Sequence, residues 1–198
     1  MLTLGGKRVL TTHAEILDPN HTAVLVVDMQ NDFCSPGGVF AQCGHDIAAV
    51  HGVVAPIGRL LEAARRAGSR VIYIMMTTMP DYQSWAPSYI KFNLEHLNLA
   101  PGTFYTLPDS WGWQVVDALA PQRGDLLVRK WRSSGFVGTN LDLILRSSGV
   151  QSLVICGTAS YACVDSTLRD ATHLDYYTVV PSDCVGGTDH ELHTAALR

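Results

Sequence analysis

The sequence predicts an α/β fold: a single domain over residues 1–198 with an open, mainly parallel sheet and helices on both faces, in a three-layer, Rossmann-like arrangement. Short continuous apolar runs alternate along the chain with segments of helical period. No internal repeat, low-complexity stretch or linker divides the chain. The composition, with 47% hydrophobic and 16% charged residues, is that of a chain that can bury a sizeable core.

Five short runs are predicted as strands. Each is rich in Val, Ile, Leu, Met or aromatic residues and nearly unbroken by polar positions, the pattern of a strand buried on both faces of a parallel sheet. In chain order these runs cover residues 23–27, 70–76, 125–128, 151–156 and 176–181. Strand, helix and strand in series indicate right-handed crossovers between parallel neighbours.

Between the strands, apolar residues recur with helical spacing. The longest such segment, residues 47–67, ends at Gly68, a typical C-cap, and contains Pro56, which is expected to kink or split the helix. The other predicted helices cover residues 113–119, 139–148, 161–174 and 189–198. The stretch from 77 to about 110 contains four prolines and no sustained period, and connections of this length are usually functional.

Charge and cysteine usage limit the function classes. The formal net charge is −4 and no Lys/Arg cluster appears, which argues against nucleic acid or an anionic membrane as the main partner. The longest apolar runs fall far short of the ~20 residues that cross a bilayer, and the N-terminus lacks the features of a secretory signal. The odd number of widely spaced cysteines argues against a disulfide framework. We therefore expect a cytoplasmic protein that acts on a small molecule.

Three reactive side chains follow predicted strands, where ligands bind in open parallel sheets: Asp28, Lys130 and Cys163. Cys163 falls in the first turn of a predicted helix, whose free N–H groups and dipole are expected to lower the pKa of the thiol and to bind an oxyanion. Asp28 is a candidate general base with a pKa raised by partial burial. Simpler alternatives are a buried structural Cys, a turn-capping Asp and a solvated Lys.

Three segments resemble the isochorismatase-like cysteine hydrolases, a family that includes nicotinamidases, N-carbamoylsarcosine amidase, biuret hydrolase and ureidoacrylate amidohydrolase. They are AVLVVDMQNDF at 23–33, Lys130 with Ser134-Gly135-Phe136 and Thr139 behind it, and GTASYACVDSTLRDA at 157–171. They follow one another in the family's order, and the resemblance extends over roughly residues 22 to 187. It implies the isochorismatase-like version of the predicted fold and a homo-oligomer, either a dimer or a tetramer.

The resemblance also implies the chemistry. It assigns Asp28, Lys130 and Cys163 as the catalytic triad, a cis peptide bond between Thr158 and Ala159, and an oxyanion hole made by the backbone N–H groups of Ala159 and Cys163. The implied reaction is the cleavage of a C–N bond in a small amide or ureide through a cysteine thioester, with release of ammonia or an amine. A simple carboxamide hydrolase, similar to a nicotinamidase without metal, and a catalytically silent binding protein of the same fold are the alternatives.

Positions at which this sequence differs from the family's motifs narrow the predicted cofactor and substrate. Nicotinamidases of the family bind a metal through an Asp-x-His and a further His, but residues 79–89 contain no His, and Asp81 alone is a poor ligand set. We expect no metal and no other cofactor. Cys163 argues against the vinyl-ether chemistry of true isochorismatases, which lack the nucleophile. The segments 80–82, 112–113 and 130–136 are similar to the branch with ureidoacrylate amidohydrolase, biuret hydrolase and N-carbamoylsarcosine amidase.

Six residues near the motifs are predicted to line the substrate pocket: Gln30, Phe33, Tyr82, Trp85, Trp131 and Phe136. Large aromatics in loops are as often ordinary core, and a polar residue at a strand end often only satisfies a turn. Arg132 is a candidate partner for a substrate carboxylate, as a ureido acid would need, or else a solvated surface charge.

Overall fold

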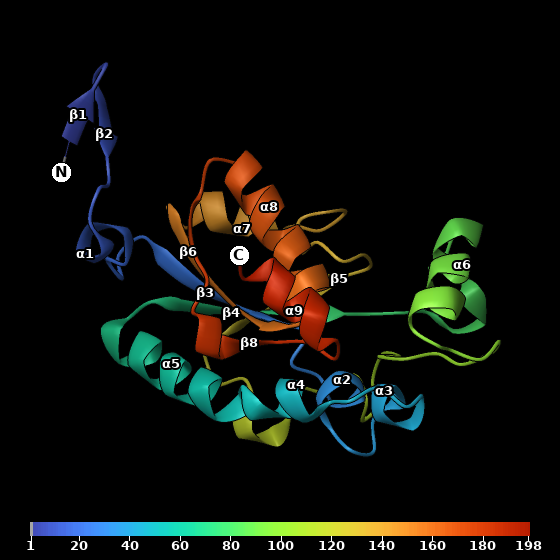
Figure 1. The fold of residues 1–198 in the computed structure, drawn as a ribbon. Coiled ribbons are helices and arrows are strands. Elements are labelled where there is room, and N and C mark those ends of the chain that lie inside the picture. Colours follow the sequence, from blue (N-terminus) through green and yellow to red (C-terminus); the bar gives the residue numbers. More distant parts are fainter. Residues whose placement is uncertain (1) are drawn as a thin grey trace.

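The computed structural model describes residues 2–198 and is built around a parallel sheet (Figure 1). Its strand order is β5-β4-β3-β6-β7, with β8 also paired to β6. The strands are β3 (Thr22–Val27), β4 (Arg70–Met76), β5 (Leu126–Lys130), β6 (Ser152–Thr158), β7 (Tyr177–Val179) and β8 (Val185–Gly186). Every pairing in this sheet is parallel. The predicted α/β fold with a mainly parallel sheet is confirmed.

Helices cover both faces of the sheet, as predicted (Figure 1). One face packs on α4 (Ala48–Gly52) and α5 (Val54–Ala67), and the other on α7 (Leu141–Ser147) and α8 (Asp165–His173). Successive side chains of a strand point to opposite faces, so β3 supplies Val24 and Val26 to the first core and Ala23, Leu25 and Val27 to the second. Both faces of β3 are therefore apolar, which explains its unbroken apolar sequence.

Shorter elements complete the fold. The remaining helices are α1 (His13–Ile16), α2 (Asn31–Cys34), α3 (Val39–Gln42), α6 (Pro87–His96) and α9 (His190–Ala196). Residues Pro80–Tyr82, Asp117–Leu119 and Ser182–Cys184 form 3₁₀ turns, and Ser160–Val164 forms a π-helical segment ahead of α8. A hairpin of β1 (Leu2–Leu4) and β2 (Lys7–Val9) projects from the body of the molecule (Figure 1). Within residues 2–198, no helix combines the length and apolarity needed to cross a membrane.

Two helix predictions differ from the structure. The segment 47–67 is split, but at Val53 rather than at Pro56, because Pro56 falls in the first turn of α5, where its missing N–H breaks no helical bond. The predicted helix 113–119 is wrong except for its last turn. Its first half runs extended beside α2: Val115 forms a β-bridge with Gln30, and the Gln114 carbonyl accepts from the Asn31 N–H at 2.9 Å.

The long segment 77–110, predicted as irregular, contains α6. Pro87 stands at the first position of this helix, where a fixed φ favours helix initiation. Only Asn93 of α6 is fully buried. Figure 1 shows α6 set apart from the helices that cover the two faces of the sheet. Tyr89 and Ile90 are the α6 residues that pack against the first core, and other residues of this helix contribute to the site described next.

Candidate active site

The sheet places three reactive side chains at the same edge. Asp28 follows β3 directly, Lys130 is the last residue of β5, and Cys163 lies in the π-helical segment that follows β6. The ammonium nitrogen of Lys130 is 2.8 Å from Oδ2 of Asp28 and 3.2 Å from Sγ of Cys163. Three side chains that are separated by up to 135 positions in the sequence thus form one cluster, with Lys130 between the carboxyl and the thiol.

Asp28 is fixed by the backbone around it. Its φ of 52° turns the chain out of β3, and its Oδ1 accepts a hydrogen bond from the Met76 N–H at 2.9 Å. The side chain is only 2% exposed. Burial raises the pKa of this carboxyl above its ordinary value, against the opposing effects of the Lys130 charge and of hydrogen bonds from Lys130, Cys163 and Met76. A carboxylate with a raised pKa is a stronger base, as predicted from the sequence.

Lys130 is completely buried, so it is not the solvated lysine of the simpler interpretation. Besides Asp28 and Cys163, its ammonium donates to the Arg132 carbonyl at 3.1 Å and approaches Sδ of Met76 at 3.6 Å. Burial alone would lower the pKa of Lys130, but the negative charge of Asp28 outweighs it, with a further contribution from Cys163, and raises the pKa above the ordinary value. Lys130 is therefore a permanent positive charge in this cluster.

Cys163 differs from the sequence prediction in its acidity. The predicted lowering of its pKa is wrong for the resting site: burial of the sulfur raises the pKa of the thiol to about 12, with Lys130 opposing and Asp28 adding to the shift. Cys163 lies in a five-residue π-helical segment that continues directly into α8, so the helix N-terminus is present, but the burial of the sulfur outweighs its effect on the thiol. At rest the site holds a neutral thiol whose sulfur lies 3.2 Å from the Lys130 ammonium, beside the Asp28 carboxyl.

The backbone before Cys163 follows an unusual path. The Thr158–Ala159 peptide bond is cis, at the position that the family resemblance implied. Gly157 has a φ of 119°, and a Cβ at this position would lie 2.0 Å from the Val27 carbonyl oxygen, so only glycine fits between β6 and β3. The Ala159 carbonyl then accepts from the N–H groups of Ala162 and Val164 at 3.0 and 3.1 Å. These contacts close the π-helical segment over the end of β6.

A cavity of about 440 Å³ opens onto this cluster. Asp28, Thr158, Ala159 and Cys163 line its inner end. Its apolar and aromatic lining includes Phe33, Phe40, Tyr89, Phe92, Tyr105 and Leu192. Its other polar lining residues are His45, His96, Ser133, Tyr161, Thr188 and Asp189. The volume fits a small organic molecule, and the lining has the usual character of such a site, apolar walls with a few polar groups.

Of the six predicted pocket residues, the structure brings only Phe33 to this cavity. Gln30 is fully buried, and its side-chain amide donates to the carbonyls of Met76 and Trp113 at 3.0 and 2.9 Å. Its neighbour Asn31 donates in the same way to the Trp111 carbonyl at 3.0 Å. These two residues hold the turn and bridge at 111–115 against the end of β3, so they shape the site without facing the substrate.

The other predicted aromatics pack elsewhere. Tyr82 and Trp85 pack in tilted arrangements against Phe104 as part of the first core, with ring centroids 5.0 and 5.6 Å from that ring. Phe136 stacks on Tyr176 at 6.1 Å. Aromatic periodicity cannot distinguish such core positions from a substrate wall, because both bury the ring.

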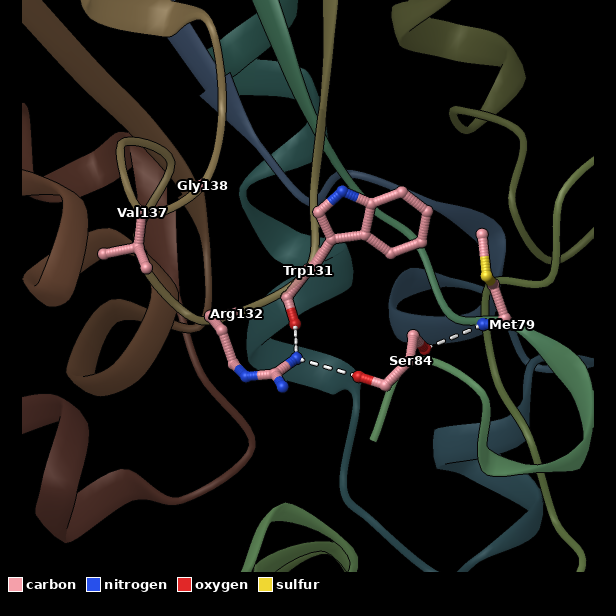
Figure 2. Close-up of a pocket in the computed structure, with 6 residues that line it drawn as sticks. All are labelled: Met79, Ser84, Trp131, Arg132, Val137 and Gly138. Atoms are coloured by element: carbon pink, nitrogen blue, oxygen red, sulfur yellow. Dashed lines mark hydrogen bonds between the residues drawn. The ribbon is translucent and has the colours of Figure 1, made fainter. Parts of the chain in front are cut away.

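Trp131 and Arg132 line a second, more open pocket of about 480 Å³ with Met79, Ser84, Val137 and Gly138 (Figure 2). Figure 2 shows the Arg132 guanidinium directed at the Ser84 carbonyl, to which it donates at 3.1 Å. The guanidinium also lies over the Tyr89 ring, 4.6 Å from its centroid. Arg132 is thus half-buried and held by protein groups, and it is not among the residues of the cavity that contains Cys163.

Sequence reasoning missed the residues that form the outer walls. On α6, Tyr89, Phe92 and His96 recur at helical spacing and form a stacked series, with centroid distances of 6.0 and 4.8 Å. Pro87 at a helix start and this spacing could together have predicted the helix and the face that it turns to the cavity. His45, in the loop after α3, and the residues of α9 carried no local signal, because only the tertiary fold brings them to the cavity.

The Asp-x-His and further His that the resemblance associates with a metal have no counterpart in segment 79–89. Among residues 2–198, no group of three or more His, Cys, Asp and Glu side chains is arranged to hold a metal ion. Asp81 lies in an exposed 3₁₀ turn and is not part of the cavity lining. The residues of this chain therefore do not fit the metal site that some members of the family possess.

Comparison with known proteins gives the family. The family model described as the isochorismatase domain matches residues 22–198. The chain belongs to the isochorismatase family. A ureidoacrylate amidohydrolase, RutB, of Rhizobium rhizogenes is 42% identical over 181 residues, which are 84% of this chain and 71% of the relative. A RutB of Agrobacterium fabrum is 41% identical, with 84% and 76% covered. The family prediction is confirmed.

Solved structures of the isochorismatase family agree with this assignment. A cysteine hydrolase from Pseudomonas syringae pv. phaseolicola superposes with a TM-score of 0.78 at 30% identity, with 92% of this chain and 85% of that one covered. N-carbamoylsarcosine amidase from Thermoplasma acidophilum gives a TM-score of 0.69 at 28% identity, with 88% and 89% covered.

Proposed function

We propose that this amidohydrolase of the isochorismatase family cleaves a C–N bond of a small amide or ureide, with Cys163 as nucleophile, Asp28 as general base and acid, and Lys130 as a fixed positive charge. One observation carries the proposal: Lys130 Nζ lies within 2.8 Å of the Asp28 carboxylate and 3.2 Å of the Cys163 sulfur, at the inner end of a cavity of small-molecule size. The amidohydrolase names of its relatives support the same reaction class.

The first half of the cycle forms a thioester. Because the pKa of Cys163 is raised, the thiol must lose its proton as it attacks, and Asp28, the carboxylate that shares the Lys130 ammonium with Cys163, takes it. The sulfur adds to the carbonyl carbon, and the negative charge moves to the carbonyl oxygen. Asp28 then gives the proton to the departing nitrogen, the C–N bond breaks, and ammonia or an amine leaves.

The second half releases the acid product. A water molecule gives a proton to Asp28 as its oxygen adds to the thioester carbon. The carbon–sulfur bond breaks, and the proton returns to the sulfur, so that the enzyme ends as it began. Lys130 stays protonated throughout, and its charge compensates the anionic forms of both Asp28 and Cys163. The backbone N–H groups of Ala159 and Cys163 are the proposed oxyanion hole, since both residues line the inner end of the cavity.

This mechanism uses no metal or other cofactor, since all its proton transfers and its nucleophile come from the chain. We retain three further predictions on the same footing. The chain acts as one domain over residues 1–198, it assembles as a homo-oligomer, either dimer or tetramer, and it works in the cytoplasm on a small-molecule substrate.

The test removes the nucleophile. We expect Cys163→Ala and Cys163→Ser to lower kcat by at least ~10³-fold, the usual cost of losing a nucleophile. Ammonia release is measured for biuret, ureidoacrylate, N-carbamoyl amino acids and nicotinamide, and Cys156→Ala, a buried cysteine outside the cavity, is the matched control. A Cys163→Ala enzyme that keeps most of its activity would overturn the mechanism.

The same screen separates the alternatives. Turnover of nicotinamide alone would favour the simple carboxamide hydrolase. Binding of substrates without turnover in the wild-type chain would favour the catalytically silent binding protein.

A further inference from the structure

Beyond the reactive cluster, the cavity is lined by two histidines whose hydrogen bonds define their proton positions. His45 Nε2 lies 2.9 Å from the Leu97 carbonyl oxygen. A carbonyl oxygen only accepts, so Nε2 carries the proton and Nδ1 of the neutral ring is an acceptor. The ring is stacked on Phe40, with centroids 5.0 Å apart and planes inclined by 30°, which restricts its orientation.

His96 repeats this arrangement on α6. Its Nδ1 lies 3.3 Å from the Phe92 carbonyl oxygen one turn earlier, so Nε2 of the neutral ring is again an acceptor. The ring is stacked on Phe92, at 4.8 Å and 14°. Phe92 is 41% exposed, which places this pair at the mouth of the cavity rather than at its floor.

A carboxylate completes the polar lining on the opposite segment. Asp189 caps α9, with Oδ1 accepting the Leu192 N–H at 2.9 Å, and it lines the same cavity. Among the described residues that line the cavity there is no Lys or Arg. Two nearby cations do not line these walls. Lys130 is enclosed by Asp28, Cys163 and the Arg132 carbonyl, and Arg132 lines the neighbouring pocket.

Besides hydroxyls, which can donate or accept, the walls beyond the reactive cluster therefore offer two imidazole acceptors and a negative charge and, among the described residues, no Lys or Arg. We propose, on the basis of the amide or ureide hydrolysis proposed above, that this cavity selects an uncharged substrate with N–H donors at the end remote from the scissile bond, and that His45 accepts from that end. A substrate carboxylate would lose its hydration without gaining a permanently charged partner, and would face Asp189. A carboxamide or ureide group would instead donate to the free ring nitrogens.

The test compares two compounds of nearly the same shape, N-carbamoylglycine and N-carbamoylglycinamide. They differ only in a terminal carboxylate against a carboxamide. Loss of the carbamoyl group is followed by mass spectrometry, so that cleavage at the terminal amide is counted separately. We expect kcat/KM for the carboxamide to exceed that for the carboxylate by at least ~10-fold, the effect of one lost or repelled polar contact.

Substrate binding is measured independently through protection of Cys163 from iodoacetamide at pH 9, where the carboxamide should protect at a lower concentration than the acid. Equal or better turnover and protection by the acid would overturn the substrate class while leaving the hydrolase mechanism intact. If neither compound protects Cys163, the proposed substrate class is overturned as well. Failure of the mechanism itself is distinct, since it appears as turnover that survives Cys163→Ala.

Variants of Asp189 and His45 test whether these residues produce the preference for the carboxamide over the carboxylate. Asp189→Asn keeps an N-cap of similar quality and removes the charge, so we expect kcat/KM for N-carbamoylglycine to rise several-fold. His45→Phe keeps the stacked ring and removes the acceptor, and should lower kcat/KM for the carboxamide by about 10-fold with little change for the acid. His45→Gln, whose amide can donate to Leu97 and still accept, should restore part of the loss. If His45→Phe leaves the ratio of the two kcat/KM values unchanged, His45 does not accept a hydrogen bond from the remote end of the substrate.

Discussion

The inner and outer parts of the cavity are built differently. The inner part consists of side chains at the ends of β3 and β5, where Asp28 and Lys130 are 2% and 0% exposed and bond to one another and to the backbone of the sheet. The outer part consists of the loop with His45 and the helices α6 and α9, where Phe92 and Leu192 are 41% and 49% exposed. The proposed catalytic residues thus lie in the buried part, at the ends of the strands. The residues proposed to select the substrate lie in the more exposed outer segments.

The largest effect is expected where the inner part is broken. Lys130→Met removes one member of a buried ion pair and leaves Asp28 enclosed without a counter-charge, which costs about 3–5 kcal/mol of unfolding free energy. We expect kcat to fall by ~10³-fold or more as well, because the same charge supports the thiolate. Denaturant unfolding and ammonia release measure the two effects.

An exposed lysine provides the matched control for Lys130. Lys91→Met removes the partner of Glu95 on α6, a pair whose side chains are 69% and 51% exposed, and should cost no more than about 0.5 kcal/mol. Similar losses for Lys130→Met and Lys91→Met would contradict the contrast between the two parts of the cavity.

A second prediction concerns the acidity of the inner part. With a pKa of about 12, about one Cys163 in ten thousand is ionised at pH 8, against about a quarter of ordinary thiols of pKa ~8.5. Since the pKa is raised, the thiolate fraction still increases tenfold per pH unit well above pH 9. The rate of Cys163 alkylation by iodoacetamide should therefore climb from pH 7 to 10 without a plateau.

Peptide mass spectrometry measures this rate, and the partly exposed Cys43 in the same digest gives an internal comparison. A plateau of Cys163 labelling near pH 7 would mean a preformed thiolate and would restore the low pKa that the sequence suggested.

A third prediction tests the path of the backbone beneath Cys163. Gly157→Ala places a Cβ 2.0 Å from the Val27 carbonyl oxygen, and strand backbones cannot yield as flexible side chains do. We expect a loss of about 2–4 kcal/mol in unfolding free energy, in the range of severe overpacking. Gly58→Ala in α5 is the control, since the nearest atom there is Cδ2 of Leu119 at 3.8 Å. It should be neutral or stabilising by up to about 1 kcal/mol, from helix propensity. Equal effects at both glycines would show that the strand contact is not tight.

The inner part is also what the sequence predicted best. Apolar runs that end at Asp28 and Lys130 mark parallel strands whose carboxyl ends share an edge, which permits these side chains to meet, and the family resemblance assigned them to one triad. The outer part was predicted poorly, because Trp85, Trp131 and Phe136 have the same local pattern as the aromatics that line the cavity. The acidity of Cys163 was mispredicted for a related reason: helix-start position is visible in the sequence, but desolvation depends on everything that packs around the sulfur.

The smallest predicted effect lies where the two parts meet. Ser160, next to the proposed oxyanion donor Ala159, shares a 2.8 Å hydrogen bond with Nδ1 of His193 on α9, and Tyr161 shares one of 2.9 Å with Thr188. These contacts tie α9 to the π-helical segment that carries Cys163. We expect His193→Ala to lower kcat about 10-fold through a misaligned oxyanion hole, with KM changed less than twofold, since one weakened donor costs at most the ~10²–10³-fold of a deleted one.

His193→Asn, which can place an amide group near the position of Nδ1, should recover most of the kcat lost in His193→Ala. Ser160→Ala should match His193→Ala, and the double variant should be no worse than either single variant, because both remove the same bond. A change in KM alone would place His193 in the outer, substrate-selecting part. Additive losses in kcat would show that the two residues act separately, and that α9 does not position the nucleophile's turn through this bond.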